Sequence, residues 1–222
     1  MAAYSWHVDA CGCDEFAEVF DRRTADSDRR RYRRAGPDRT TRQLLELLRA
    51  RGVEGASILD VGGGIGVVDH ELLTTGASRA VLVDASAASV AAAGDEARDR
   101  GTADRLEILR GDFVVRSAEF EPADIVTLDR VICCYPDVEG LVGLSAARAR
   151  RLYGIVLPRE RRLARIAIGL TNAWFRLRGK AYRAFVHPNA VVDALAAASG
   201  LRLAAESGTF IWRVALFERP VG

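Results

Sequence analysis

The sequence predicts an α/β fold, in which a Rossmann-like, doubly wound sheet is mostly parallel and ends in an antiparallel C-terminal hairpin. From residue 56 onward, short apolar runs alternate with Ala-rich runs of helical periodicity, which is the pattern of strand–helix–strand units. The apolar runs alternate little with polar residues, as expected for strands that are covered on both faces. Only residues 207–209 separate the last two apolar runs, and so short a link joins antiparallel neighbours.

The predicted elements follow one another in a regular order along this part of the chain. Each predicted strand is a short run rich in Val, Ile or Leu, and each predicted helix is a longer run with apolar residues three and four apart. Strands are placed at residues 57–61, 79–84, 105–110, 123–128, 152–157, 201–206 and 210–218. Helices are placed at residues 67–75, 87–100, 138–150 and 189–199.

Residues 1–52 are predicted to be an N-terminal helical extension to a domain at residues 53–222. Within the extension, residues 39–49 place several leucines on one helical face, and Asp38 is suited to cap that helix. We expect Tyr32 of this extension to touch a ligand of the domain.

The first residues of the extension contain a histidine and two cysteines. His7, Cys11 and Cys13 provide three soft metal ligands but lack the second ligand pair of a structural zinc site, so we expect free thiols there.

A basic, amphipathic segment at residues 160–178 follows the fifth predicted strand. On a helical wheel, Arg161, Arg165, Asn172 and Arg176 share one face, and apolar residues share the opposite face. The simplest interpretation is an ordinary surface helix. The sharper one is a lid that closes on an apolar, acidic acceptor, or a helix that rests on a membrane surface.

The charge of the chain is uneven although its net charge is only +2. Residues 21–42 contain nine Arg and four Asp, and residues 148–180 contain ten basic residues and a single acid, Glu160. These segments favour an acidic small molecule, a phosphate-bearing ligand or an anionic membrane surface, with solvated helix faces as the alternative. The N-terminus lacks a signal-peptide pattern and no apolar stretch reaches about 18 residues, so a cytoplasmic protein with reduced cysteines is expected.

The stretch ILDVGGGIG, residues 58–66, carries the strongest functional signal. Gly62, Gly64 and Gly66 follow a predicted strand that contains Asp60, and glycines at such a place let backbone N–H groups approach a ligand closely. A dinucleotide fingerprint, G-x-G-x-x-G, would require the third glycine at Val67. The spacing found is G-x-G-x-G, which points away from a dinucleotide.

This spacing resembles motif I of the class I S-adenosylmethionine-dependent methyltransferases. The resemblance implies that the loop Gly62, Gly63, Gly64 and Gly66 passes under the methionine part of S-adenosylmethionine, and that Asp60 helps to orient that part. Gly63 stands where a Cys or Ser is common in the family. The resemblance covers about residues 56–218, and it implies the fold described above.

Later residues extend the resemblance to the rest of the cofactor. Asp84 ends the second predicted strand, where a carboxylate can accept both ribose hydroxyls, a feature that NAD sites share. Ala85 follows it where a larger apolar residue often packs on adenine. The resemblance implies that Asp112 binds the adenine amino group, that Phe113 stacks on the ring, and that Asp129 lies beside the methyl group.

The resemblance implies metal-independent methyl transfer to a small-molecule acceptor, and we expect an oxygen as the methylated atom. Asp129, Tyr135 and His187 are the candidate catalytic residues; His187 is a possible general base, with a structural or capping role as the alternative. Cys134 and Tyr135 are expected to line the acceptor pocket, whereas Cys133 is expected to be a buried apolar residue. No metal ligand pair accompanies Asp129, so no catalytic metal is expected.

The arrangement of DRVICCYPD, a helix and RLYGIVLPRE is similar to that of magnesium-protoporphyrin O-methyltransferases, whose acceptor is a porphyrin propionate. Two alternatives stay open: an RNA or protein methyltransferase, favoured by the two Arg-rich segments, and a cofactor-binding partner subunit without catalysis. The oligomeric state is not predicted.

Overall fold

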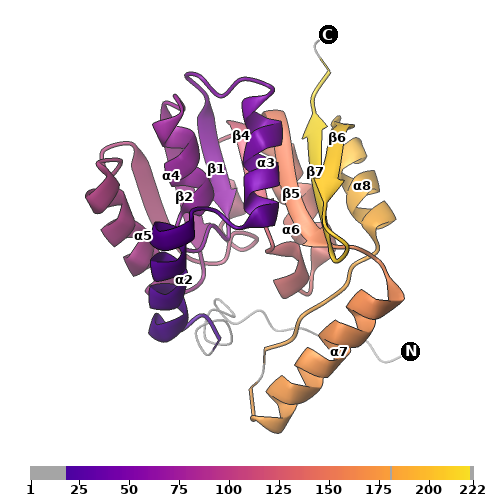
Figure 1. The fold of residues 1–222 in the computed structure, drawn as a ribbon. Helices are drawn as coiled ribbons and strands as arrows, with labels where there is room; N and C mark the ends of the chain where they lie inside the picture. The colour runs from indigo at the N-terminus through magenta and orange to yellow at the C-terminus, as the bar shows by residue number, and fades with distance from the viewer. Residues whose placement is uncertain (1–18, 181, 221–222) are drawn as a thin grey trace.

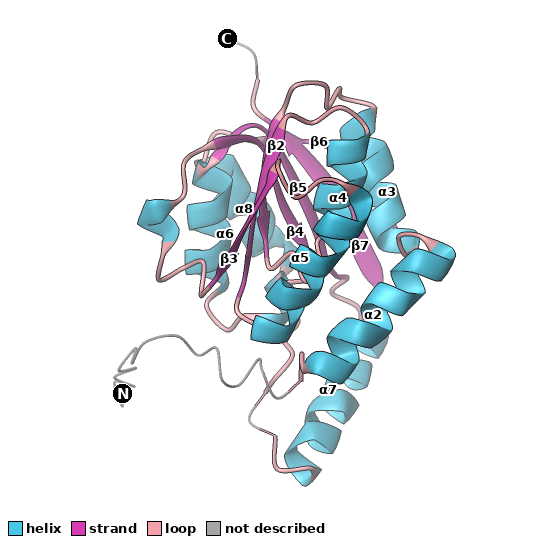
Figure 2. Cartoon of the chain, turned by 90° about the vertical axis from the view of Figure 1, so that its left-hand side faces the viewer, coloured by secondary structure: helices cyan, strands magenta, loops and turns pink. Residues whose placement is uncertain are grey.

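The computed structural model describes residues 19–180 and 182–220, which form a seven-stranded sheet with helices against both faces (Figures 1 and 2). The strand order is β3-β2-β1-β4-β5-β7-β6, and only the pairs β5–β7 and β6–β7 are antiparallel. The predicted fold class is therefore confirmed. The strands are β1 (Ser57–Val61), β2 (Arg79–Asp84), β3 (Leu106–Arg110), β4 (Ala123–Asp129), β5 (Ala149–Pro158), β6 (Arg202–Gly208) and β7 (Trp212–Glu218).

Helices lie before, between and after these strands, close to the predicted positions. They are α2 (Arg22–Ala35), α3 (Arg39–Arg49), α4 (Val67–Thr74), α5 (Ala87–Arg100), α6 (Val138–Ala147), α7 (Arg162–Leu177) and α8 (Asn189–Ala198), with short 3₁₀ helices η1 (Ser117–Glu119) and η2 (Ile132–Cys134). None of the helices among the described residues is both long and apolar enough to cross a membrane. His7, Cys11 and Cys13, where free thiols are expected, lie outside the described residues.

Several element boundaries differ from the sequence prediction by one to three residues, and two of them have a visible cause. β5 begins at Ala149, so the helix expected to reach residue 150 ends earlier; Ala149 already pairs with Ala123, and the Arg151 guanidinium donates to the carbonyls of Arg51 and Gly52. β7 begins at Trp212, because the Thr209 hydroxyl accepts the N–H groups of Ile211 and Trp212 and so turns the chain. Long-range contacts in the first case and local hydrogen bonds in the second overrode the apolar pattern.

The sheet brings the carboxyl ends of β1, β2 and β4 to one edge. β1 pairs in parallel with β2 on one side and with β4 on the other. The chain reverses its direction of winding between β1 and β4, and ligands of open α/β sheets bind beside such a switch point. In Figure 1, α2 and α7 lie beyond this same edge.

Each face of the sheet has its own apolar core. One core joins the sheet to α6 and α8, and the other joins it to α3, α4 and α5. Leu44, Leu45 and Leu48 of α3 are fully buried, and a Cβ at Gly154 would approach Leu44 Cδ1 to 2.7 Å, so this glycine lets α3 approach β5 closely. α3 thus shares the core of the sheet, while the boundary predicted at residue 52 stays a prediction.

Candidate functional site

A cavity of about 490 Å³ opens at the carboxyl-end edge of the sheet. The loops after β1, β2, β3 and β4 form most of its wall, and α2 and the start of α3 close one side. Two predicted site residues, Gly66 and His187, do not belong to the lining. The predicted residues that do line the cavity are Asp60, Gly62, Gly63, Gly64, Asp84, Ala85, Asp112, Phe113, Asp129 and Tyr135.

The glycine loop requires glycine for two different reasons. Gly62, Gly64 and Gly66 have φ values of 67°, 59° and 79°, a conformation that side chains with a Cβ rarely adopt. Gly63 is required by close approach instead, because a Cβ there would lie 2.6 Å from Asp60 Oδ2. Gly66 is the N-cap of α4, which explains why it shapes the loop without lining the cavity.

Asp84 holds the loop in place from the neighbouring strand. Its Oδ2 accepts the Gly64 N–H at 2.9 Å, and its Oδ1 accepts the Ser86 N–H at 2.8 Å. Burial raises the pKa of Asp84, and these two N–H groups act in the opposite direction. Each carboxylate oxygen of Asp84 can accept one further hydrogen bond. Asp84 could therefore still bind ligand hydroxyls, and this role stays a prediction.

A second carboxyl group, which sequence reasoning missed, lies beneath the loop. Asp60 and Asp69 are both buried, and the Thr127 hydroxyl donates to Asp60 Oδ1 at 2.6 Å. Burial and then the neighbouring Asp69 raise the pKa of Asp60 well above its usual range, and burial raises the pKa of Asp69 to about 7. Two carboxyl groups in contact cannot both ionise at low cost, so they hold a proton. Asp60 therefore supports the loop from below.

Asp129 belongs to a polar cluster that ties β4 to α3. The Thr41 hydroxyl donates to Asp129 Oδ2 at 2.5 Å, and Arg130 Nε donates to Oδ1 at 3.2 Å. Arg130 also pairs with Asp38, the N-cap residue of α3. Burial raises the pKa of Asp129, and the charge of Arg130 opposes that rise. Both Asp129 oxygens are thus engaged, and Arg130 places a cation in the cavity wall.

The sequence assigned Asp112 to the cofactor and Tyr135 to the acceptor, yet the two side chains are in contact. The Tyr135 hydroxyl donates to Asp112 Oδ2 at 2.9 Å and to Oδ1 at 3.1 Å. Burial, followed by the neighbouring Asp112, raises the pKa of Tyr135, so its phenol stays protonated at neutral pH.

Phe113 is buried against Phe120, with ring centroids 5.3 Å apart, and it also lines the cavity.

A tyrosine after α7 contacts one of two thiols that line the cavity. Cys133 is buried, as expected, and Cys134 is partly buried; both line the cavity. The Tyr182 hydroxyl donates to Cys134 Sγ at 3.0 Å. The Tyr182 ring meets Phe20 of the cavity lining on one side and Phe175 of α7 on the other. An aromatic series thus connects α7 to the cavity wall.

His187 lies outside the cavity lining. Its Nε2 is 2.9 Å from the Tyr135 carbonyl oxygen, and since a carbonyl only accepts, Nε2 carries the hydrogen. The imidazole also stacks on Phe185. These contacts suit a residue that positions Tyr135, and the role of general base stays a prediction. Across the described part of the chain, no three His, Cys, Asp or Glu residues are grouped so as to hold a metal ion.

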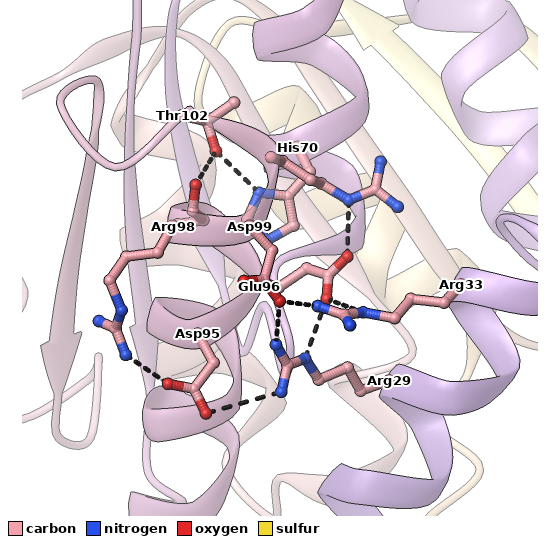
Figure 3. A network of polar contacts seen from close by, with 10 residues as sticks. Arg29, Arg33, His70, Asp95, Glu96, Arg98, Asp99 and Thr102 are labelled. Carbon is pink, nitrogen blue, oxygen red and sulfur yellow. Dashed lines mark hydrogen bonds and ion pairs between the residues drawn. The ribbon is translucent and has the colours of Figure 1, made fainter.

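Ion pairs with α5 fix α2 against the cavity (Figure 3). Arg29 and Arg33 both pair with Glu96, which is buried, and with Asp99. Burial alone would raise the pKa of Glu96, but hydrogen bonds from Arg100, Arg33 and Arg29 lower it to about 2. Two arginines of the basic segment 21–42 are therefore neutralised by acids of α5.

Tyr32 lines the cavity from α2, where the sequence placed it beside the ligand. Its hydroxyl donates to Glu71 Oε1 at 3.0 Å, and the Arg100 guanidinium lies 4.2 Å from its ring centroid.

Comparison with known proteins gives a consistent family. The sequence model of the family "Methyltransferase small domain" matches residues 27–132. Ribosomal protein L11 methyltransferase from Serratia proteamaculans is 27% identical over 154 residues, which cover 65% of this chain and 52% of the relative. The same enzyme from Edwardsiella ictaluri is 28% identical over 153 residues. The chain spans about half the length of the curated relatives that it matches.

Solved structures extend the likeness of fold to nearly the whole chain. Magnesium protoporphyrin IX methyltransferase from Synechocystis PCC 6803, with bound S-adenosylhomocysteine, superposes with a TM-score of 0.65 at 17% identity, covering 96% of this chain and 89% of that one. An O-methyltransferase family protein from Burkholderia thailandensis gives 0.69 at 18% identity, covering 93% and 63%. A putative RNA methyltransferase from Pyrococcus horikoshii gives 0.56 at 14% identity, covering 81% of each chain.

These proteins are all named as methyltransferases but differ in what they methylate. Their acceptors, by name, include a ribosomal protein, a porphyrin and RNA. The resemblance drawn from the glycine loop, with its cofactor, is therefore confirmed, whereas the class of acceptor is not resolved by the comparisons.

Proposed function

We propose, from the premise that this chain is a class I methyltransferase that uses S-adenosylmethionine, that it methylates an oxygen of a small, apolar acceptor that carries a carboxylate, without a metal. The observation that carries this proposal is the part of the lining after β4, where Val131, Cys133 and Cys134 follow Arg130, a cation that Asp38 and Asp129 hold in the wall. A mostly apolar stretch of wall beside a cation suits an apolar molecule with one anionic group.

The residues of the cavity fit the cofactor. Gly63 leaves space that a Cβ would fill, and the Asp84 carboxylate keeps acceptor positions at the lining. The lining is rich in acids, which suits a ligand with sulfonium and ammonium charges. Its charged residues are Asp28, Asp38, Asp60, Asp84, Asp112 and Asp129 against Arg31 and Arg130. Gly62, Gly63, Gly64, Asp84, Asp112 and Phe113 would hold the cofactor.

Bound S-adenosylmethionine would supply an electrophilic methyl group on its sulfonium. The protein then has to align the acceptor oxygen and exclude water. The side chains beside the cavity are poor candidates for a base, because Tyr135 is protonated and donates to Asp112, and His187 faces the Tyr135 carbonyl. An acceptor that is already ionised, such as a carboxylate, needs no base, and Arg130 favours its anionic form.

A protein acceptor is the second candidate, because the curated relatives named as ribosomal protein L11 methyltransferases match about two thirds of this chain. A protein side chain would have to enter the cavity from outside. A small molecule can instead occupy the apolar end completely.

A turnover assay tests the proposal. Purified full-length protein is incubated with S-adenosylmethionine and either apolar carboxylic acids, phenols or ribosomal protein, and methylated products are identified by mass spectrometry. We expect methyl esters of the carboxylic acids, and we expect Arg130→Gln to raise KM for them about tenfold or more, the loss of one charge-assisted contact. Arg31→Gln is the control, because Arg31 lines the cavity but pairs with Asp28 on the exposed surface.

Two results would contradict the proposal. Methylation of ribosomal protein with none of the small acids would select the second candidate. Cofactor binding without turnover across the whole panel would indicate a cofactor-binding subunit.

A further inference from the structure

α7 exposes an apolar stripe that no described part of the fold covers. Ile166, Leu170, Trp174 and Leu177 recur at helical spacing on one face, and their exposed fractions are 58%, 68%, 47% and 87%. Monomeric proteins rarely expose several large apolar side chains side by side, and such patches mark interaction surfaces.

The stripe faces away from the side by which α7 is attached. On the attached side, Asn172 exchanges two hydrogen bonds of 2.8 Å with the backbone of Ala184, and Phe175 packs on Tyr182 with ring centroids 5.3 Å apart. Figures 1 and 2 show α7 standing off the sheet; residues 159–161 connect it to β5 and residues 178–188 connect it to α8. The apolar stripe is therefore accessible to a partner outside the cavity, while the role of a lid for α7 stays a prediction.

The tip of the β6–β7 hairpin adds to the same surface. Phe210 and Ile211 are 59% and 48% exposed. The Arg161 guanidinium lies 4.5 Å from the Phe210 ring centroid, which joins the tip to the start of α7. We call the stripe and the tip together the α7 surface: Ile166, Leu170, Trp174, Leu177, Phe210 and Ile211.

The α7 surface is bordered by cations. The exposed arginines at and beside the two ends of α7 are accompanied by one acid, Glu160, which pairs with Arg165. By helical spacing Arg162 and Arg178 flank the apolar stripe, and the Arg178 guanidinium lies 4.6 Å from the Trp174 ring centroid. Arg161 meets the tip at Phe210, whereas Arg165 and Arg176 lie on the opposite, polar face of α7.

We propose that the α7 surface docks on an anionic lipid membrane, with α7 lying in the plane of the interface and its apolar stripe among the acyl chains. A helix with exposed Leu, Ile and Trp on one side and arginines at its borders has the composition of interfacial helices. Trp174 suits the boundary between headgroups and acyl chains, and the arginines suit anionic headgroups.

Charge and shape favour this occupant over two others. A second copy docked by the same face would set like arginines against one another. A nucleic acid would satisfy the arginines but would leave the aliphatic side chains of Ile166, Leu170 and Leu177 without an apolar partner. A lipid surface satisfies both, and it requires no membrane-spanning helix.

The position of α7 gives the docking a consequence for the cavity. Phe175 contacts Tyr182, and Tyr182 donates to Cys134 in the cavity wall. Docking would hold the acceptor end near the lipid, which suits an apolar acceptor; this consequence rests on the proposed function, whereas the docking does not.

Vesicle co-sedimentation of the full-length protein tests the proposal. We expect binding to vesicles of phosphatidylcholine with phosphatidylglycerol, weaker binding at higher salt, and little binding to phosphatidylcholine alone. The double variant Leu170→Asp/Leu177→Asp should bind at least about tenfold more weakly, since each leucine would lose its burial in lipid. Leu203→Asp is the control, because Leu203 is 48% exposed on the edge strand β6, outside the α7 surface.

The outcomes separate the possible occupants. S-adenosylhomocysteine binding by calorimetry should be equal in the wild type, the double variant and the control, which also shows that the variants are folded. Absence of vesicle binding, or vesicle binding that the double variant retains, would overturn the proposal. Without vesicle binding, a dimer lost in the double variant would indicate a second copy. Salt-sensitive retention of the protein on RNA without vesicle binding would likewise indicate that the α7 surface binds a nucleic acid instead of a lipid.

Discussion

The cavity has two halves that are built in different ways. The half that we propose for the cofactor, called the cofactor half, consists of the glycine loop, Asp84 and the α2 wall, and polar contacts hold it to regular strands and helices. The half that we propose for the acceptor, called the acceptor half, consists of residues 131–135, and it is held by the segment after α7 through the Tyr182 hydroxyl, the Phe185 N–H and His187. The first half is thus part of the sheet's own framework, whereas the second depends on a segment that joins a largely exposed helix. Mutations should therefore separate cofactor binding from acceptor binding.

The largest effect is expected from removing the centre of the α2–α5 ion cluster. Glu96→Ala leaves Arg29, Arg33 and Arg100 without their shared buried carboxylate, so we expect a loss of about 3–5 kcal/mol in the free energy of unfolding. Because α2 forms a wall of the cofactor half, affinity for S-adenosylhomocysteine should fall as well. Urea unfolding and calorimetry measure the two changes.

The neighbouring acid Asp95 provides the matched control for Glu96. It lies on the same helix and pairs with Arg29 and Arg98, but its side chain is 49% exposed, so Asp95→Ala should cost about 0–1 kcal/mol. Equal costs for the two substitutions would mean that burial does not distinguish these ion pairs.

A pH-dependent effect is expected from the acid pair beneath the glycine loop. The folded pKa of Asp69 is about 7, above its ordinary value of 3.8, so the folded state holds a proton that the unfolded state has lost. Its contribution to stability is therefore fully present below about pH 4 and is lost as the pH rises through about 7. Asp69→Asn removes the group that binds this proton. Between about pH 4 and 7, the free energy of unfolding of the variant should therefore fall less steeply with pH than that of the wild type, and the difference in slope should correspond to about one proton.

Urea unfolding at a series of pH values compares the wild type with Asp69→Asn. The difference between the slopes isolates Asp69 from other titrating groups, including His70, whose pKa burial lowers to about 4. Parallel curves for the two proteins would contradict a proton held at Asp69.

The smallest effect on stability is expected in the acceptor half. Asn172→Ala removes both hydrogen bonds between α7 and Ala184, and because these lie at the protein surface, we expect a loss of about 1 kcal/mol or less in unfolding. Affinity for S-adenosylhomocysteine should not change, while KM for the acceptor should rise. Thr171→Ala is the control, because the Thr171 hydroxyl bonds only within α7. A change in cofactor affinity would show that the two halves are not separable.

The same division explains how much could be predicted from sequence. The glycine loop and Asp84 are local signals, placed by a strand before them and by the parallel pairing of β1 with β2, so sequence reasoning located both. Asp69 was missed because a single acid in the first turn of a helix has the pattern of a favourable helix start. Its burial beside Asp60 depends on packing that no local pattern reports.

Long-range pairs account for the remaining differences. Arg29 and Arg33 are indistinguishable in sequence from their exposed neighbours, and only their contact with Glu96, more than sixty residues later, makes them structural. The contact of Asp112 with Tyr135 and the tie of Arg130 to Asp38 likewise join separate loops. Asp38, which follows a proline, caps α3 as predicted. This role could be predicted because an N-cap depends only on residues adjacent to it in the chain.

Calorimetric titration of S-adenosylhomocysteine into the wild type and Asp84→Ala tests the central claim, that the cavity at the glycine loop is the cofactor site, most directly. The wild type should bind one equivalent. Asp84→Ala should bind about a hundredfold more weakly or worse. The Gly64 and Ser86 N–H groups lose the carboxylate that they share, and the ligand hydroxyls lose the same acceptor. A wild type that does not bind, or an Asp84→Ala variant that binds equally well, would contradict the account.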